Sequence, residues 1–266
     1  MIILLAELHN KISQSGSNLS DRLEDKLTGD FFGAIRYLPF ELGLKQALSS
    51  VEFSQNHIHD KWQSLLDTQT GFPATWNFWH REEEGEIDVL ISFNEMIIGI
   101  EVKYLSGISS EDQDIFNQDD YTQSVNQLAR YSRMLERLSG NRDAYLLFLS
   151  PYEMMNCVKN AMKGRSIISP SVELGYISWE DIYESLKELD FNQIDKGQQF
   201  ILKDLQDLLF KKEFIRFRGF TLDETIQPII KVPFSFDGQN TKSEDFLNWP
   251  IQNIKEDQSY VYKNTE

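Results

Sequence analysis

The sequence predicts an α/β protein in which helices flank a mixed central sheet. Short apolar runs bounded by turn residues, such as residues 86–93 and 144–150, have the length and composition of strands. Longer segments with apolar residues at helical spacing, such as residues 51–69 and 121–139, separate these runs. The composition is ordinary for a globular protein, and 266 residues suffice for one domain with additions or for two small domains.

The elements expected before the central strands are three helices and then one strand, over residues 19–27, 34–49, 51–69 and 75–82. Ser20 is a suitable N-terminal cap for the first helix, because its hydroxyl can accept a hydrogen bond from the first turn. The third helix should end before the breaking sequence at residues 71–73. Side chains of a strand alternate between two faces, so Trp76, Phe78 and His80 should share a face.

The run EIDVLISFNEMIIGIEVKYLSG, residues 86–107, predicts two strands joined by a tight turn at Asn94-Glu95. One face of the first strand should carry Ile87, Val89, Ile91 and Phe93. One face of the second strand should carry Ile98, Ile100, Val102 and Tyr104. The opposite faces carry Asp88 on the first strand and Glu101 and Lys103 on the second. Charges on such apolar strands are costly unless they are paired or bind a metal, so these three residues form a candidate site.

Residues 106–120 are polar and acidic, and we expect them to form a mobile loop beside this site. Helices and strands should then alternate, with helices over 121–139, 152–163, 180–189 and 196–213 and strands over 144–150 and 173–179. The chain becomes polar and irregular from Leu222. We therefore expect residues 1–190 to form the core with its N-terminal helices, and residues 191–266 to form a helical extension and an irregular tail packed on that core.

Two neighbouring carboxylates attract a hard cation such as Mg²⁺, which takes oxygen ligands and usually combines one or two carboxylates with substrate phosphate. Asp88 and Glu101 suit this role, and the carbonyl of Val102 is a further candidate ligand. Mn²⁺ accepts the same ligand set. Lys103 could orient the attacking water and stabilise charge on phosphorus. These residues indicate hydrolysis of a phosphodiester bond.

The pattern resembles the PD-(D/E)XK nuclease superfamily, which carries an Asp on the second core strand and Glu-x-Lys or Asp-x-Lys on the third. Asp88 and Glu101-Val102-Lys103 occupy those positions, although Ile87 stands where the family name has proline. A subset of the superfamily also carries Gln-x-x-x-Tyr on the next helix, and Gln127 and Tyr131 match it. The resemblance covers roughly residues 20–180 and implies a restriction-endonuclease-like αβββαβ core.

The resemblance also implies roles for residues outside the two strands. Glu24 matches a helical Glu that approaches the metal in members of the superfamily, and Asp25 is the second candidate for this position. Gln127 and Tyr131, four residues apart on one helix face, would position substrate or water, and Gln123 extends that face. From the residues alone, other interpretations stay open. The strand residues could form a solvated ion pair on a surface hairpin, and Gln127 and Tyr131 could belong to a helix face packed on the sheet. Glu24 could be an exposed helix charge.

The formal net charge of −16 argues against a broad basic surface that coats nucleic acid. A local basic patch interleaved with aromatic residues is the best candidate for contact with DNA, and consists of Lys211, Lys212, Arg216 and Arg218. Phe214 or Phe217 could stack on the bases of a single strand. An ordinary core element with solvated Lys and Arg explains the same residues. The acidic charge also leaves room for a protein partner that supplies the DNA contacts.

Three functional hypotheses follow. The first is a metal-dependent nuclease acting on DNA, of the kind that serves restriction, phage defence or repair. The second is a nuclease fold that binds or assembles without cleaving, and the third is an enzyme acting on small nucleotides. Phosphate-binding and dinucleotide-binding glycine motifs are missing, which argues against ATP-driven and nicotinamide chemistry. The single cysteine and the non-basic start MIILLAELHN suggest a cytoplasmic protein, and no apolar run is long enough to span a membrane.

Overall fold

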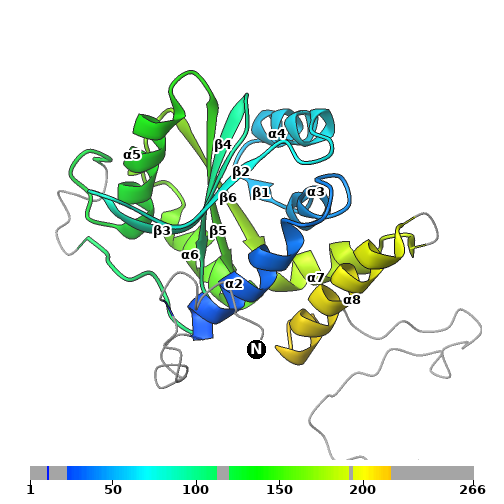
Figure 1. Ribbon diagram of the computed structural model, residues 1–266. Helices are drawn as coiled ribbons and strands as arrows, with labels where there is room; N and C mark the ends of the chain where they lie inside the picture. The colour runs from blue at the N-terminus through cyan, green and yellow to red at the C-terminus, as the bar shows by residue number, and fades with distance from the viewer. Residues whose placement is uncertain (1–10, 12–22, 113–119, 192–193, 217–266) are drawn as a thin grey trace, which may run out of the picture. The chain divides into compact units, whose positions relative to one another are not determined.

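The structure is a computed structural model that describes residue 11 and residues 23–112, 120–191 and 194–216 (Figure 1). This part of the chain is α/β, with a six-stranded mixed open sheet flanked by helices, as the sequence predicts. The strands are β1 (Glu52–Phe53), β2 (Thr75–Glu82), β3 (Gly85–Ser92), β4 (Met96–Val102), β5 (Asp143–Ser150) and β6 (Val172–Ser178). They lie in the order β1-β6-β5-β4-β3-β2.

The sheet combines an antiparallel half and a parallel half. β2, β3 and β4 pair antiparallel, and β4, β5 and β6 pair parallel. The short edge strand β1, which the sequence did not reveal, pairs antiparallel with β6. Every residue of β4 is buried, as expected for a central strand covered on both faces.

The helices are α2 (Leu23–Ile35), α3 (Leu44–Leu48), α4 (Asn56–Thr68), α5 (Gln127–Ser139), α6 (Tyr152–Met162), α7 (Trp179–Lys187) and α8 (Lys196–Lys211). One hydrophobic cluster joins one face of the sheet to α2, α3, α4, α7 and α8, and a second cluster joins the other face to α5 and α6. Figure 1 shows α5 across the sheet from α3 and α4. The sheet is thus covered on both faces, which places the β4 end within reach of α2 and α5.

Several predicted helix boundaries are wrong for identifiable reasons. The first predicted helix should end at residue 27 and the second should begin at residue 34, whereas α2 continues through both positions to Ile35. The chain then turns before the short α3. Pro39 lacks the N–H that helix continuation needs, and a Cβ atom at Gly43 would lie only 2.9 Å from Cβ of Leu38. The predicted helix over 51–69 begins only at Asn56 because β1 precedes it. Ser20, the predicted cap, lies outside the described residues.

The prediction that Ile87 shares a face with Val89 is also wrong. Ile87 packs in the cluster under α5, whereas Val89 and Ile91 pack in the opposite cluster. The alternation changes at Asp88, where the β2–β3 register pairs Phe78 with Val89 and His80 with Ile87 but leaves Trp79 and Asp88 unpaired. Trp79 has a positive φ of 50°, so the edge strand departs from extended geometry at this point.

The chain divides into two compact units, residues 1–217 and 218–266, and the described residues all belong to the first. α8 is part of this first unit and packs against α2 and α7, so the helical portion of the expected extension lies on the core. The expected irregular tail lies outside the described residues. Among the described helices, none combines the length and apolarity needed to cross a bilayer.

Candidate active site

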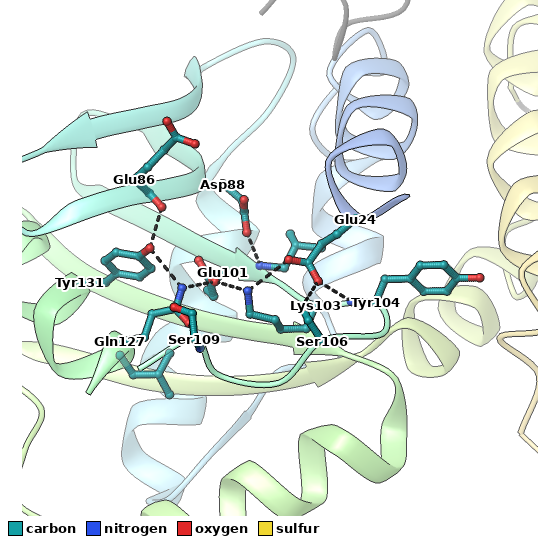
Figure 2. A network of polar contacts seen from close by, with 12 residues as sticks. Glu24, Glu86, Asp88, Glu101, Lys103, Tyr104, Ser106, Ser109, Gln127 and Tyr131 are labelled. Atoms are coloured by element: carbon teal, nitrogen blue, oxygen red, sulfur yellow. Dashed lines mark hydrogen bonds and ion pairs between the residues drawn. The ribbon is translucent and has the colours of Figure 1, made fainter. Parts of the chain in front are cut away.

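The candidate site forms where the ends of β3 and β4 meet the first turns of α2 and α5 (Figure 2). Asp88 projects from β3, and its Oδ2 accepts a hydrogen bond of 2.8 Å from the backbone N–H of Val102 on β4. This bond ties the two strand ends together beside Glu101. The structure therefore brings together the acidic pair that the alternation of the two strands predicted.

Glu101 is the most buried acidic side chain of the site, with 2% of its surface exposed. Its Oε1 lies 2.6 Å from Nζ of Lys103 and accepts a hydrogen bond of 2.6 Å from Nε2 of Gln127. Its Oε2 is buried and has no hydrogen-bond partner among the residues that the structure describes. Burial raises the pKa of Glu101 to about 7, although Lys103 acts in the opposite direction.

Asp88 is half-buried, and its pKa is raised well above the ordinary value, first by desolvation and then by the charge of Glu101. The charge of Glu101 makes ionisation of Asp88 more costly, and the two carboxylates form an electronegative centre at the sheet end. Such a centre favours protons or a cation in the space between the two groups.

Lys103 supplies one positive charge to this centre. Lys103 is 5% exposed, and its ammonium lies 2.6 Å from Glu101 Oε1 and 3.2 Å from Glu24 Oε1. Burial alone would lower its pKa, but Glu101 and Glu24 outweigh burial and raise it. Lys103 is therefore charged at neutral pH and is held by a carboxylate on each side.

Glu24, in the first turn of α2, reaches the site as predicted. Its Oε2 accepts hydrogen bonds from the N–H of Tyr104, at 2.9 Å, and the hydroxyl of Ser106, at 2.8 Å. Asp25, the reserve candidate, accepts a bond of 3.1 Å from the indole of Trp79. Glu24 is thus the acidic residue of α2 that fixes Lys103 and the segment after β4.

Gln127 and Tyr131 face the sheet from α5, and both are buried. Gln127 Nε2 donates to Glu101 and, at 3.2 Å, to the hydroxyl of Tyr131, which itself donates to the carbonyl of Glu86 at 2.6 Å. Desolvation, aided by the charge of Glu101, raises the pKa of Tyr131 to about 12, so the phenol stays protonated. The contacts show that Gln127 orients Glu101. The role of either residue toward substrate stays a prediction.

The predicted helical face that includes Gln123 is wrong, because α5 begins at Gln127 and Gln123 lies exposed in the preceding turn. The cap is Asn126, whose side chain accepts from the N–H groups of Leu128 and Ala129. Sequence reasoning missed this residue, although an Asn directly before an apolar-periodic segment is a recognisable helix-start signal.

The segment after β4 is bound to α5 where it is described. The N–H of Ser109 donates to Gln127 Oε1 at 3.0 Å, and the carbonyl of Ser110 accepts from the N–H of Gln127 at 3.2 Å. Both ends of the Gln127 amide are thereby used, which fixes its Nε2 toward Glu101. Residues 113–119 of the predicted mobile loop lie outside the described residues.

The donor set fits a hard divalent cation. Mg²⁺ commonly takes one or two protein carboxylates and completes its shell with water and phosphate. Asp88 and Glu101 can supply these carboxylates, and the buried Oε2 of Glu101 lacks any other partner. Within the described ranges, no group of three or more His, Cys, Asp or Glu side chains is arranged to hold a metal. The fit is therefore to an ion that relies on water and substrate for its other ligands.

The predicted basic patch is only partly available for DNA. Phe214 is buried and stacks on Trp179 with ring centroids 5.6 Å apart, so its predicted stacking on a base is wrong. The ammonium of Lys212 lies over the ring of Tyr104, and Arg216 pairs with Asp181 at 3.7 Å. Phe217 and Arg218 lie outside the described residues.

Comparison with protein-family models, with curated proteins and with solved structures found no match for this chain. The interpretation of the site therefore depends on its own geometry. That geometry offers two carboxylates with raised pKa, a buried unpartnered carboxylate oxygen, and a charged lysine held between Glu24 and Glu101.

Proposed function

We propose that this protein is a metal-dependent nuclease that hydrolyses phosphodiester bonds in DNA. The observation that carries the proposal is the buried Oε2 of Glu101, which lacks a hydrogen-bond partner beside Asp88 and the charged Lys103. Burying a carboxylate oxygen without a partner costs about 1–3 kcal/mol or more, and a bound cation would remove that cost. The adjacent ammonium suits a substrate whose reaction develops negative charge.

The order of elements supports a restriction-endonuclease-like core. A helix, three antiparallel strands, a helix and a parallel strand follow one another as α4, β2-β3-β4, α5 and β5. The residues that resemble the PD-(D/E)XK motif lie on β3, on β4 and just after β4, and those that resemble Gln-x-x-x-Tyr lie on α5. Motif and topology therefore agree, which supports the superfamily assignment as part of this proposal.

Each side chain of the site has a distinct task in the proposed reaction. Asp88 and Glu101 would hold Mg²⁺ or Mn²⁺, with the Val102 carbonyl as a further candidate ligand. The bound ion would polarise a phosphoryl oxygen and lower the pKa of its water. Lys103 would stabilise the negative charge on the phosphoryl group, since Glu24 and Glu101 keep it protonated. Gln127 would hold Glu101 in place.

The decisive experiment is cleavage of linear and circular DNA, single- and double-stranded, with Mg²⁺ or Mn²⁺. Lys103→Ala should lose cleavage by about 100-fold or more, because it removes a preorganised positive charge, while keeping metal binding. Glu101→Ala should lose both. Lys187→Ala, which removes an exposed lysine on α7, is the matched control. Absence of cleavage by folded wild-type protein on every substrate, with either metal, would contradict the proposal.

A second candidate is a binding or assembly module that does not cleave. It is favoured by the ion pairs of Lys103, which compensate much of the acidic charge without a metal, and by the net charge of −16. Such a module would bind its partner equally well in wild-type protein and in Glu101→Ala or Lys103→Ala. The nuclease proposal predicts that these variants differ from wild type and from each other.

A further inference from the structure

A recess in the protein surface lies beside the end of α2, away from the candidate active site. It encloses about 300 Å³ between the turn that leaves α2 and the loop that enters β2. Arg36, Tyr37, Phe72 and Trp76 are among the residues that line it. Tyr37 and Phe72, 61% and 69% exposed, present two aromatic rings to solvent at this one recess.

Arg36 differs from every other arginine in the described part of the chain. The other seven each donate a hydrogen bond to, or form an ion pair with, a carboxylate or a backbone carbonyl, and they are Arg81, Arg130, Arg133, Arg137, Arg142, Arg165 and Arg216. Among the described residues, Arg36 donates only to the hydroxyl of Tyr37, at 2.9 Å. Within the same residues, its buried Nε has no hydrogen-bond partner. The guanidinium thus lies without a carboxylate partner in the described part of a chain whose net charge is −16.

Aromatic rings hold the guanidinium of Arg36 in place. Its Cζ lies 4.9 Å from the centre of the Tyr37 ring and 5.6 Å from that of Phe78. Trp76 stacks on Phe78 with ring centroids 6.2 Å apart and an interplanar angle of 13°. A guanidinium fixed in this way presents its remaining donors at little entropic cost, and its planar fork matches a phosphate.

We propose that this recess binds an unpaired nucleotide of the substrate strand. The base would contact the rings of Tyr37, Phe72 and Trp76, and its phosphate would accept hydrogen bonds from Arg36. Stacking on aromatic rings tolerates any base, and small-molecule sites have volumes from about 300 Å³ upward. The inference rests on the proposed function for the identity of the strand as substrate, whereas binding itself needs neither metal nor cleavage.

α2 connects the recess to the candidate active site. Glu24 lies in the first turn of α2, and Arg36 directly follows its last residue. Twelve helical residues correspond to about 18 Å, at 1.5 Å per residue. That distance equals about five stacked nucleotides of one strand. The recess would therefore hold a strand several nucleotides away from the bond that the site cleaves.

The test is equilibrium binding of a fluorescein-labelled single-stranded oligothymidine to the full chain in EDTA, read by anisotropy. Arg36→Gln and Phe72→Ala should each raise the dissociation constant about tenfold, as expected for the loss of a phosphate contact or a stacked base. Lys187→Gln removes a cation on α7, and Phe200→Ala removes an exposed ring on α8. These two control variants should bind like wild type.

Two competitors identify the ligand. Thymidine monophosphate should displace the oligonucleotide from wild type if a single nucleotide suffices, and a blunt duplex should compete poorly because its bases are paired. Unchanged binding by Arg36→Gln, an equal loss in Lys187→Gln, or equal competition by the duplex would overturn the inference. If the wild-type protein shows metal-dependent cleavage and Arg36→Gln binds the oligonucleotide normally, this inference is wrong but the proposed function stands. Binding that depends on Arg36 without any cleavage would instead remove the proposed nuclease activity.

Discussion

At the residue scale, Glu101 links the site to the stability of the fold. Its pKa rises from 4.5 to about 7 on folding because burial disfavours the charged form. A group whose pKa is raised on folding contributes stability that is fully present below its unfolded pKa and is lost as the pH rises through its folded pKa. Asp88 shifts in the same direction, so both carboxylates act together.

We therefore expect the metal-free protein to lose stability between about pH 5 and pH 8, with Glu101 contributing about 3 kcal/mol of this loss. Urea unfolding in EDTA across this range measures it. Glu101→Gln should flatten the dependence, leaving the part due to Asp88. Glu188→Gln, which changes an exposed carboxylate after α7, should leave it unchanged. An equally steep dependence in Glu101→Gln would contradict the assignment.

Alternation along two apolar strands predicted Asp88, Glu101 and Lys103 as one group, although the alternation changes at Asp88. Glu24 was predicted from the resemblance to the nuclease superfamily and not from the strand pattern. Sequence reasoning could not assign a partner to each group. That Glu24 binds the N–H of Tyr104, or that Gln127 binds Ser109, depends on how α2 and α5 approach the strand ends. Such approach geometry follows from side-chain packing, which a single sequence does not display.

At the element scale, Gly99 allows α5 to pack closely on β4. A Cβ atom at this position would lie 2.5 Å from Cδ1 of Ile87 and 2.9 Å from Cδ1 of Leu135. We expect Gly99→Ala to destabilise the protein by about 1–3 kcal/mol, because a full core has no room for the added methyl group. Chemical unfolding at fixed pH measures the change.

Two further variants make this prediction specific. Ile87→Val removes the Cδ1 atom nearest to the added methyl, so it should partly rescue Gly99→Ala. Gly107→Ala places its methyl in open space, with no atom within 4 Å, and should be close to neutral. If Ile87→Val and Gly99→Ala were additive, Ile87 would not face α5 as the structure places it.

The strands were easier to predict than the helix limits for a physical reason. Runs such as residues 144–149 are apolar throughout because both of their faces are covered, so their extent is visible in composition. Helix starts depend on single caps, and α5 starts at Gln127, directly after its cap Asn126, even though the polar turn before it could continue the helical spacing. The irregularity at Trp79 depends on one backbone angle and left no sequence signal.

At the scale of the whole molecule, the site exists only in the folded chain. α2, β3, β4 and α5 each contribute a side chain or a backbone group, and these elements are far apart in the sequence. A cation that binds Asp88 and Glu101 together therefore binds the folded state in preference to the unfolded one. By mass action, such a ligand raises the midpoint temperature of unfolding.

We accordingly expect Mn²⁺ or Mg²⁺, at a fixed concentration about 100 times its dissociation constant at about pH 8, to raise the Tm at that pH by about 5–10 °C. The rise should be larger at about pH 8 than at about pH 6, because protons compete for the two carboxylates, whose pKa values are both raised. Asp88→Asn should abolish it, while Asp204→Asn, on the exposed face of α8, should preserve it. A rise independent of pH, or retained in Asp88→Asn, would place the cation elsewhere and would separate metal binding from the acidic pair.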